Sequence, residues 1–463
     1  MDAAELTLTQ AHRAIARAEV SPVELLDAVC TRVAALDSHL NATVAVFHDA
    51  ARSCARAAER EIVRNGPRGP LHGIPISVKE IVDLAGVPTL AGSASRAAHP
   101  DAHVPARDAV AVRRLREAGA IVFATSRSHE LAYGVTTPRT HNPWRYDRSP
   151  GGSSGGAAAL VAARCGPVAL GTDTAGSVRI PASVCGTVGL KPTPGLVPRT
   201  GIVPLSETLD TPGPLGRTVD DTAAVLAVLT GMDLNPGLPD ATRLPNGLNL
   251  SEVRIGVPTT YFFDGCDPEI AAATHRTIAA LDELGAQTRE VALPYGQELA
   301  TAGGIVVGAE AGAEHGGLLE EDPDSLTDEV RSKLAVGRDI SAVDYLDAQR
   351  TLRSVSRRWD AVLRDIDVLV TPTLAATARP FGAASTDPGQ DPRIRHTRLT
   401  QPANLTGRPA ITIPCGLDTA DIPMGVQLIG RAHEENTLLA VARAVEMTVA
   451  WSDRVPLAAD TAQ

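Results

Sequence analysis

The sequence has few aromatic residues and no closely spaced cysteines. Its 463 residues include only 5 Phe, 5 Tyr and 3 Trp, so an aromatic-lined binding site would have few residues to draw on. The six cysteines lie far apart and none belongs to a C-x-x-C pair. Because neither zinc-ligand spacing nor disulfide spacing is present, we expect buried free thiols and no metal site.

Blocks of like charge and long apolar runs are also missing. The chain has 43 Lys and Arg against 54 Asp and Glu, a formal charge of −11, with no run of five or six like charges. This balance argues against a nucleic-acid or anionic-membrane partner. The N-terminus contains early acidic residues rather than a signal peptide, and no stretch approaches the roughly 18 apolar residues of a membrane span. We therefore expect a cytoplasmic protein.

Helical and strand patterns are arranged in a recognisable order. The N-terminal portion, about residues 1–65, is predicted to be helical, with a capping box formed by Ser21 and Glu24 around Pro22. From Leu71 onwards, short apolar strands alternate with helices, one of which is predicted to begin at an Asp108 cap.

This alternation predicts an α/β fold with a central β-sheet. We expect one large domain over residues 1–463, with a mixed, twisted sheet covered by helices on both faces. Residues 232–249 are rich in Pro, Gly, Asn and Asp and are predicted to form a long surface connection.

The segment 148–156 reads RSPGGSSGG and matches the G-x-S-x-G pattern around Ser153. In an α/β-hydrolase esterase this serine follows a strand directly, but here two prolines and polar residues precede it, so the match is interpreted as accidental. A flexible linker is disfavoured because helix-forming alanines follow at once. A phosphate loop is disfavoured because the usual Lys-Ser/Thr pair is absent.

A second serine motif follows a predicted strand. Residues 171–181 read GTDTAGSVRIP, directly after the apolar residues 168–170. Small residues before Ser177 let a substrate carbonyl approach the backbone, and consecutive N–H groups there could converge on an oxyanion. Ser177 is therefore the better-placed nucleophile, and the predicted oxyanion donors are the backbone N–H groups of Thr174, Ala175, Gly176 and Ser177.

A serine nucleophile needs a general base, which is usually histidine. The downstream histidines have no flanking motif; they are His275, His315, His396 and His433. Lysine is the other option where burial favours its neutral form. Lys79, at the end of the apolar run 74–78, is the candidate of this kind.

Taken together, these pieces resemble the amidase signature family of Ser-Ser-Lys hydrolases. The resemblance implies the family fold, with Ser177 as the acyl-forming nucleophile, Ser153 as a bridge carrying a cis peptide bond, and Lys79 as the base. It also implies that no metal or organic cofactor is needed. The matching stretches are GIPISVKEIVDLAGVPTLAGS (73–93), HNPWRYDRSPGGSSGGAAALVAA (141–163), LGTDTAGSVRIPASVCGTVGLKPT (170–193), LTGRPAITIPCG (405–416) and MGVQLIG (424–430).

The resemblance also implies supporting roles. Ser154 is expected to form secondary hydrogen bonds, and Asp173 and Arg179 are expected to brace the nucleophile loop. Two positions depart from the pattern common in relatives: Arg127 stands where a small amide residue is frequent, and Ala175 replaces a glycine. The substrate-pocket candidates are Tyr133, Trp144 and Arg127.

The implied activity is hydrolysis of a carboxamide C–N bond. The substrate would be a small acyl or aryl amide, a urea or a carbamate, and the resemblance suggests a homodimer. Three alternatives stay open: the glutaminase subunit of a tRNA-dependent amidotransferase, an esterase that uses Ser153, and a binding scaffold that keeps the fold without catalysis.

Overall fold

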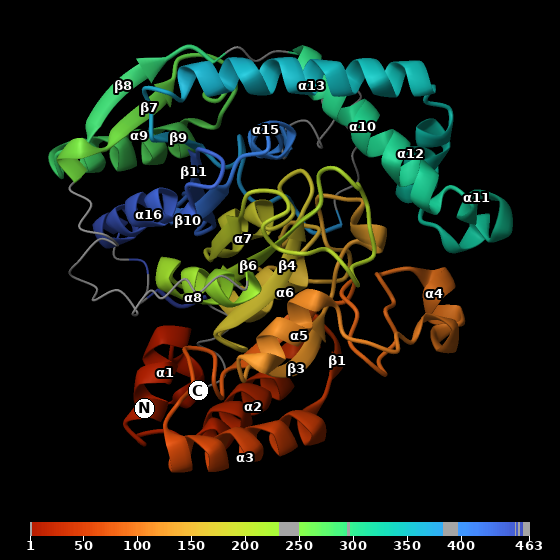
Figure 1. Cartoon of the computed structure of the whole chain (residues 1–463), viewed down its shortest axis with the longest axis vertical. Coiled ribbons are helices and arrows are strands. Elements are labelled where there is room, and N and C mark those ends of the chain that lie inside the picture. The colour runs from red at the N-terminus through yellow and green to blue at the C-terminus, as the bar shows by residue number, and fades with distance from the viewer. Residues whose placement is uncertain are drawn as a thin grey trace.

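A mixed β-sheet forms the centre of the molecule. The computed structural model describes residues 2–230, 250–293, 297–382, 397–449, 451 and 454–456. Within them, 11 strands lie in the order β1-β3-β2-β4-β6-β5-β10-β11-β9-β7-β8 (Figure 1). The strands are β1 (Thr43–Val46), β2 (Pro75–Lys79), β3 (Ile121–Ser126), β4 (Val168–Asp173), β5 (Val188–Lys191), β6 (Thr211–Gly216), β7 (Arg254–Pro258), β8 (Gln287–Val291), β9 (Val368–Pro372), β10 (Ala410–Leu417) and β11 (Pro423–Gly430). The predicted connection at 232–249 lies outside the described residues.

Parallel and antiparallel pairs are both present in the sheet. Strand β2 runs parallel to β3 and β4, and β7 runs parallel to β8 and β9. Between these groups, β6, β5, β10 and β11 pair antiparallel with their neighbours. The predicted α/β fold with a mixed sheet is therefore confirmed.

Helices cover both faces of this sheet. On β11, a Cβ added at Gly425 would meet Ser183 of α7, whereas one added at Gly430 would meet Leu438 of α16. Side chains alternate between faces along a strand, so these helices lie on opposite sides. Helix α6 packs beside α7, and α8 and α9 pack beside α16. The longer helices are α1 (Leu8–Ala16), α2 (Pro22–Leu40), α3 (His48–Asn65), α5 (Val110–Glu117), α6 (Gly155–Ala162), α7 (Arg179–Cys185), α8 (Val219–Thr230), α9 (Pro268–Glu283), α10 (Gln297–His315), α12 (Asp328–Arg338), α13 (Ala342–Val362) and α16 (Glu435–Val449); the short ones are α4 (Ala94–Ala98), α11 (Leu318–Glu321) and α15 (Gln401–Leu405).

Two further groups of helices lie at opposite ends of the molecule (Figure 1). Helices α1, α2 and α3 form the N-terminal end, and α10, α12 and α13 form a layer at the other end (Figure 1). Helix α10 packs against both α12 and α13. The predicted helical N-terminal portion is present, with β1 inserted between α2 and α3.

Local signals set the ends of several helices. At α2, Ser21 and Glu24 form the predicted capping box and Pro22 occupies the first turn. At α5 the predicted cap is wrong, because Ala109 occupies the cap position. The Asp108 carboxylate instead accepts the Ala85 N–H and pairs with Arg116.

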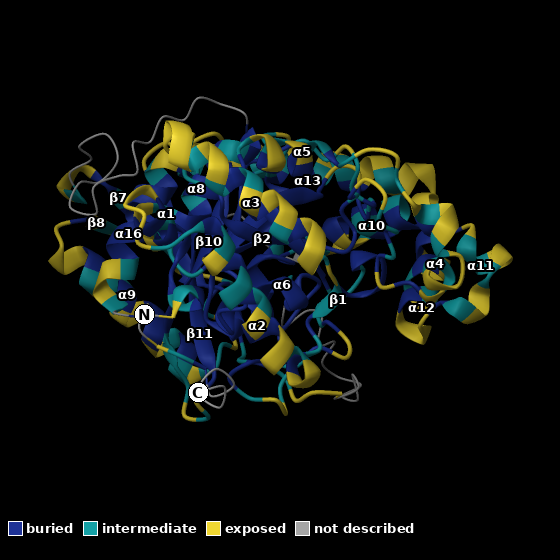
Figure 2. Ribbon diagram, turned by 90° about the horizontal axis from the view of Figure 1, so that it is seen from below, coloured by how far each residue is buried: buried dark blue, intermediate teal, exposed yellow. Residues whose placement is uncertain are grey.

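The carboxyl ends of β2 and β4 meet at the same edge of the sheet. The two strands are parallel neighbours and are buried along their whole length. Figure 2 shows β2 in the dark blue, buried interior of the molecule. Lys79 is the last residue of β2 and Asp173 is the last residue of β4. Loops that follow adjacent parallel strands lie together, which is where open α/β sheets place their sites.

Candidate active site

Lys79 and Ser153 meet at this edge of the sheet. Both side chains are fully buried. The Lys79 Nζ donates hydrogen bonds to Ser153 Oγ at 2.8 Å and to Thr172 Oγ1 at 2.9 Å. Ser153 belongs to the loop before α6, so the structure joins two of the predicted catalytic residues directly.

Ser177 lies in the loop between β4 and α7, next to the Ser153 loop. The Ser154 N–H donates to the Ser177 carbonyl oxygen at 3.1 Å, which ties the two loops together. Ser154 Oγ also donates to the Thr172 carbonyl at 3.2 Å and accepts the Thr172 N–H at 3.3 Å. Within the described residues, no hydrogen bond joins the Ser153 and Ser177 hydroxyls.

The peptide bond between Gly152 and Ser153 is cis, the form that the resemblance implies. Position 152 has no room for a side chain, because a Cβ there would lie 2.2 Å from the Thr136 carbonyl oxygen. The loop is held from outside by the His129 N–H, which donates to the Ser153 carbonyl at 3.2 Å. The Thr137 hydroxyl donates to the Gly151 carbonyl at 2.9 Å.

Burial controls the protonation of Lys79. Desolvation lowers the pKa of Lys79 from 10.5 to about 7, although the carboxylates of Asp210, Asp173 and Glu80 act in the opposite direction. Burial disfavours the charged form of an amine, and nearby negative charge favours it. At neutral pH a large share of Lys79 is therefore neutral and able to accept a proton.

Asp173 and Arg179 form a fully buried ion pair beneath the nucleophile loop, with 2.9 Å between Arg179 Nη2 and Asp173 Oδ1. Burial alone would raise the pKa of Asp173, but the Arg179 charge and its hydrogen bonds outweigh it and lower that pKa from 3.8 to about 2. Asp173 also accepts the N–H groups of Gly176 at 2.8 Å and Val178 at 3.2 Å. The pair thus braces the loop that carries Ser177.

This bracing corrects one predicted oxyanion donor. The Gly176 N–H already donates to Asp173, so in this arrangement it is not available to an oxyanion. The backbone N–H groups of Thr174, Ala175 and Ser177 are the ones that stay as candidates.

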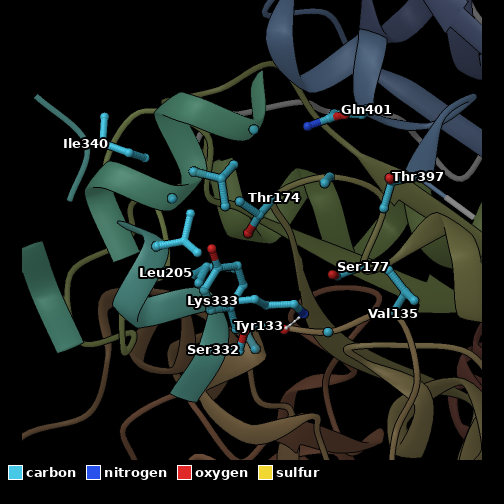
Figure 3. Close-up of a pocket in the computed structure, with 17 residues that line it drawn as sticks. Tyr133, Val135, Thr174, Ser177, Leu205, Ser332, Lys333, Ile340, Thr397 and Gln401 are labelled. Atoms are coloured by element: carbon cyan, nitrogen blue, oxygen red, sulfur yellow. Dashed lines mark hydrogen bonds between the residues drawn. The ribbon is translucent and has the colours of Figure 1, made fainter. Parts of the chain in front are cut away.

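A cavity of about 400 Å³ opens in front of Ser177. Figure 3 shows the Ser177 side chain on one side of this space, with Leu205, Lys333 and Ile340 on the other. Most of the lining comes from the segments around Tyr133 and Ser177, from the helices α10 and α12, and from the Thr397 to Gln401 segment; Leu205 and Ile340 complete it. The lining residues are Ala132, Tyr133, Gly134, Val135, Thr174, Ala175, Ser177, Leu205, Gly304, Val307, Gly308, Ser332, Lys333, Val336, Ile340, Thr397 and Gln401.

Of the three predicted pocket residues, only Tyr133 lines this cavity. Trp144 is buried elsewhere, where its Nε1 donates to the Cys185 carbonyl at 2.8 Å and its ring packs against Trp451. Arg127 donates to the Asn41 side chain and to the backbone oxygens of Asn41 and Thr43, and so fastens the end of β3 to β1. The structure therefore does not place Trp144 or Arg127 at the cavity in front of Ser177.

Sequence reasoning missed several residues of the site. Thr172 is the second acceptor of the Lys79 amine, and Asp210 is one of the carboxylates that influence it. Thr400 donates its hydroxyl to the Ala175 carbonyl at 2.6 Å and so holds the nucleophile loop from the C-terminal part of the chain. Thr172 lies within the motif 171–181, whereas Asp210 and Thr400 have no local signal.

Neither a metal cluster nor a membrane-spanning helix occurs in the part of the chain that the structure describes. No group of three or more His, Cys, Asp or Glu side chains there is suited to a metal ion. None of the described helices has the length and apolar character needed to cross a bilayer. Of the histidines considered as bases, His275, His315 and His433 are described and none lines the cavity.

The chain is similar to known amidases over nearly its whole length. Residues 24–439 match the Amidase family. An amidase of Pseudomonas putida is 41% identical, with 97% of each chain covered. A glutamyl-tRNA(Gln) amidotransferase subunit of Roseiflexus sp. (strain RS-1) is 36% identical, with 98% of each covered. A crystal structure of an amidase superposes with a TM-score of 0.86 at 32% identity, covering 96% of this chain and 100% of the other. The chain therefore belongs to the amidase family and is a hydrolase that acts on amide C–N bonds.

Proposed function

We propose that Ser177 attacks the carbonyl of a small acyl or aryl amide, with Ser153 and Lys79 as its proton relay. Neutral Lys79 accepts the Ser153 proton while Ser153 takes the proton of Ser177. The Ser177 oxygen then bonds to the carbonyl carbon. The proton returns through the relay to the nitrogen, the C–N bond breaks, the amine leaves, and water hydrolyses the ester on Ser177.

The observation that carries this proposal is the 2.8 Å hydrogen bond from the Lys79 amine to Ser153 Oγ, in a site where burial lowers the pKa of Lys79 to about 7. A lysine with that pKa can both accept and return a proton at neutral pH. The relay requires the Ser177 hydroxyl to come within hydrogen-bonding distance of Ser153 Oγ. Hydrogen bonds of this kind often tighten only when substrate binds.

The negative oxygen of the tetrahedral intermediate would be held by the backbone N–H groups of Thr174, Ala175 and Ser177. Backbone donors fixed by a buried ion pair need no rearrangement as the charge develops, which is the condition for strong electrostatic stabilisation. Asp173 and Arg179 would act as positioning residues through the loop.

Glutamine is the main alternative substrate, because relatives at 36% identity are amidotransferase subunits. Free glutamine carries an ammonium group that calls for a carboxylate partner. Among the described lining residues of the cavity, no Asp or Glu side chain is present. This chemistry favours an amide without a free ammonium group, and it leaves ureas and carbamates as substrates to be tested.

The test is a hydrolysis screen with matched serine variants. Ser177→Ala should abolish amide hydrolysis, whereas Ser332→Ala, which alters another serine of the same cavity, should retain most of it. A serine-directed fluorophosphonate should label Ser177 when the labelled peptide is mapped. Labelling of Ser153 instead would support the esterase mechanism and overturn the proposed roles.

The purified chain should turn over neutral amides or anilides rather than glutamine. Efficient release of ammonia from glutamine by the chain alone would contradict the proposed substrate class. The homodimer and the cytoplasmic location stay predictions, which sedimentation and cell fractionation can check.

A further inference from the structure

The walls of the cavity in front of Ser177 are mainly apolar. Leu205, Val307, Val336 and Ile340 contribute aliphatic side chains, and Tyr133 contributes a ring. The uncharged polar residues Thr174, Thr397 and Gln401 also line it. An apolar wall beside a few polar groups is typical of a pocket that orients a largely apolar ligand.

Lys333 brings the one charged side chain among the described lining residues, and its charge is balanced within the protein. Its Nζ donates to the Tyr133 carbonyl at 2.6 Å (Figure 3). It also donates to the Glu329 carboxylate at 2.6 Å. The same group lies 4.8 Å from the centre of the Tyr133 ring. A charged group on the substrate would have to compete with these contacts, so the cavity suits an uncharged group.

Glycine at position 304 gives this cavity part of its width. Gly304 lies on α10, and a Cβ built there meets no atom within 4 Å. Its neighbours on the helix differ: a Cβ at Gly308 would lie 3.0 Å from Ile340 Cδ1, and one at Gly303 would lie 2.7 Å from Leu405 Cδ1. A larger residue therefore enters open space at position 304 but meets other side chains at positions 303 and 308.

Building on the proposed function, we infer that the cavity binds a bulky, uncharged, apolar group of the amide substrate and that Gly304 sets the size of the group it accepts. A leucine at this position adds four carbon atoms. At about 30 Å³ for each water-sized group, it would occupy roughly a quarter to a third of a 400 Å³ cavity. Small amides would still reach Ser177, whereas the apolar groups of large amides would no longer fit in the cavity.

The experiment measures kcat/KM for wild type and Gly304→Leu with two series of substrates. One series lengthens the acyl group, from acetamide through hexanamide to phenylacetamide; the other keeps the acetyl group and enlarges the amine, up to acetanilide. In the wild type, each buried methylene should raise kcat/KM about four-fold along the favoured series. In Gly304→Leu, kcat/KM for the largest members of that series should fall ten-fold or more, and kcat/KM for acetamide should change less than three-fold.

The matched control is Ala313→Leu, which changes an exposed residue of the same helix that does not line the cavity. This variant should leave kcat/KM unchanged for both series of substrates. Size-dependent loss in either series supports the inference and tells which side of the amide occupies the cavity. If kcat/KM fell equally for small and large substrates, or did not fall at all, the inference about Gly304 would be overturned. The proposed function would stand separately, since fluorophosphonate labelling of Ser177 in Gly304→Leu reports the nucleophile whatever the substrate size.

Discussion

The protonation state of Lys79 should set the pH dependence of amide hydrolysis. Burial lowers the pKa of this lysine from 10.5 to about 7, and its neutral form is the one that can accept a proton. At pH 7 about half of the molecules would then hold a neutral Lys79. With the ordinary pKa, only about one in 3000 would, because each pH unit below the pKa reduces the neutral fraction ten-fold. Burial thus increases the fraction of neutral Lys79 at pH 7 more than a thousand-fold.

The experiment lowers the pH, and the direction of the effect on kcat/KM follows from the loss of neutral Lys79. A base whose pKa is about 7 loses its neutral form below that pH, so kcat/KM should be level above about pH 8 and fall ten-fold per unit at acid pH. About one-tenth of the plateau should remain at pH 6 and about one-hundredth at pH 5. The assay follows initial rates at low substrate concentration from pH 5 to 9 at constant ionic strength, with Ser177→Ala as the blank.

The chain offers a matched control in Lys191. This second lysine is also fully buried, and burial lowers its pKa from 10.5 to about 7, but its Nζ donates to the Pro192 carbonyl rather than to a serine. Lys191→Met should keep the midpoint of the profile, whereas Lys79→Met should remove the activity. A profile that stays flat from pH 5.5 to 8, or a midpoint that moves in Lys191→Met, would refute the assignment of Lys79.

Two further variants test the charges around the base. Asp210→Asn removes a negative charge that raises the pKa of Lys79, so the midpoint of the same pH profile should move to lower pH, by up to about one unit; a move to higher pH would contradict the electrostatic argument. Asp173→Asn leaves the fully buried Arg179 without its counter-charge and should lower the free energy of unfolding by about 3 to 5 kcal/mol. The control is Glu117→Gln, which breaks an exposed ion pair on α5 and should lower the free energy of unfolding by less than about 0.5 kcal/mol in denaturant titrations. Equal losses of unfolding free energy in Asp173→Asn and Glu117→Gln would argue against the bracing role.

Local signals in the sequence made Lys79 and Ser177 candidates, and the family resemblance implied the bridging role of Ser153. Lys79 ends an apolar strand, and Ser177 follows a predicted strand among small residues. The structure then places Lys79 and Ser153 in contact at 2.8 Å. The parallel pairing of β2 and β4 accounts for this meeting, and the alternation of strands and helices had already indicated a sheet with parallel parts.

The walls of the cavity could not be predicted in the same way. Helices α10 and α12 contribute Val307 and Val336, and apolar residues of this kind look identical in sequence whether they face a cavity or a core. Trp144 and Arg127 do not line this cavity, for a related reason. Closeness to a motif along the chain does not determine the direction of a side chain, and both side chains turn away to bind backbone carbonyls.

The partners of the nearby carboxylates explain how a lysine can stay neutral among negative charges. A carboxylate paired directly with the Lys79 amine would hold the proton there and remove the base. In the described residues, Asp173, Asp210 and Glu80 are each bonded to other donors. Asp173 binds Arg179; Asp210 accepts the N–H groups of Leu205 and Ser206 and the Thr174 hydroxyl; Glu80 accepts the N–H groups of Ser128 and Gly92. The Lys79 Nζ is left to donate to two hydroxyls, Ser153 and Thr172, which bind the amine without fixing its charge. This division of partners lets burial lower the pKa of Lys79 while Asp173 and Arg179 keep the loop of Ser177 rigid.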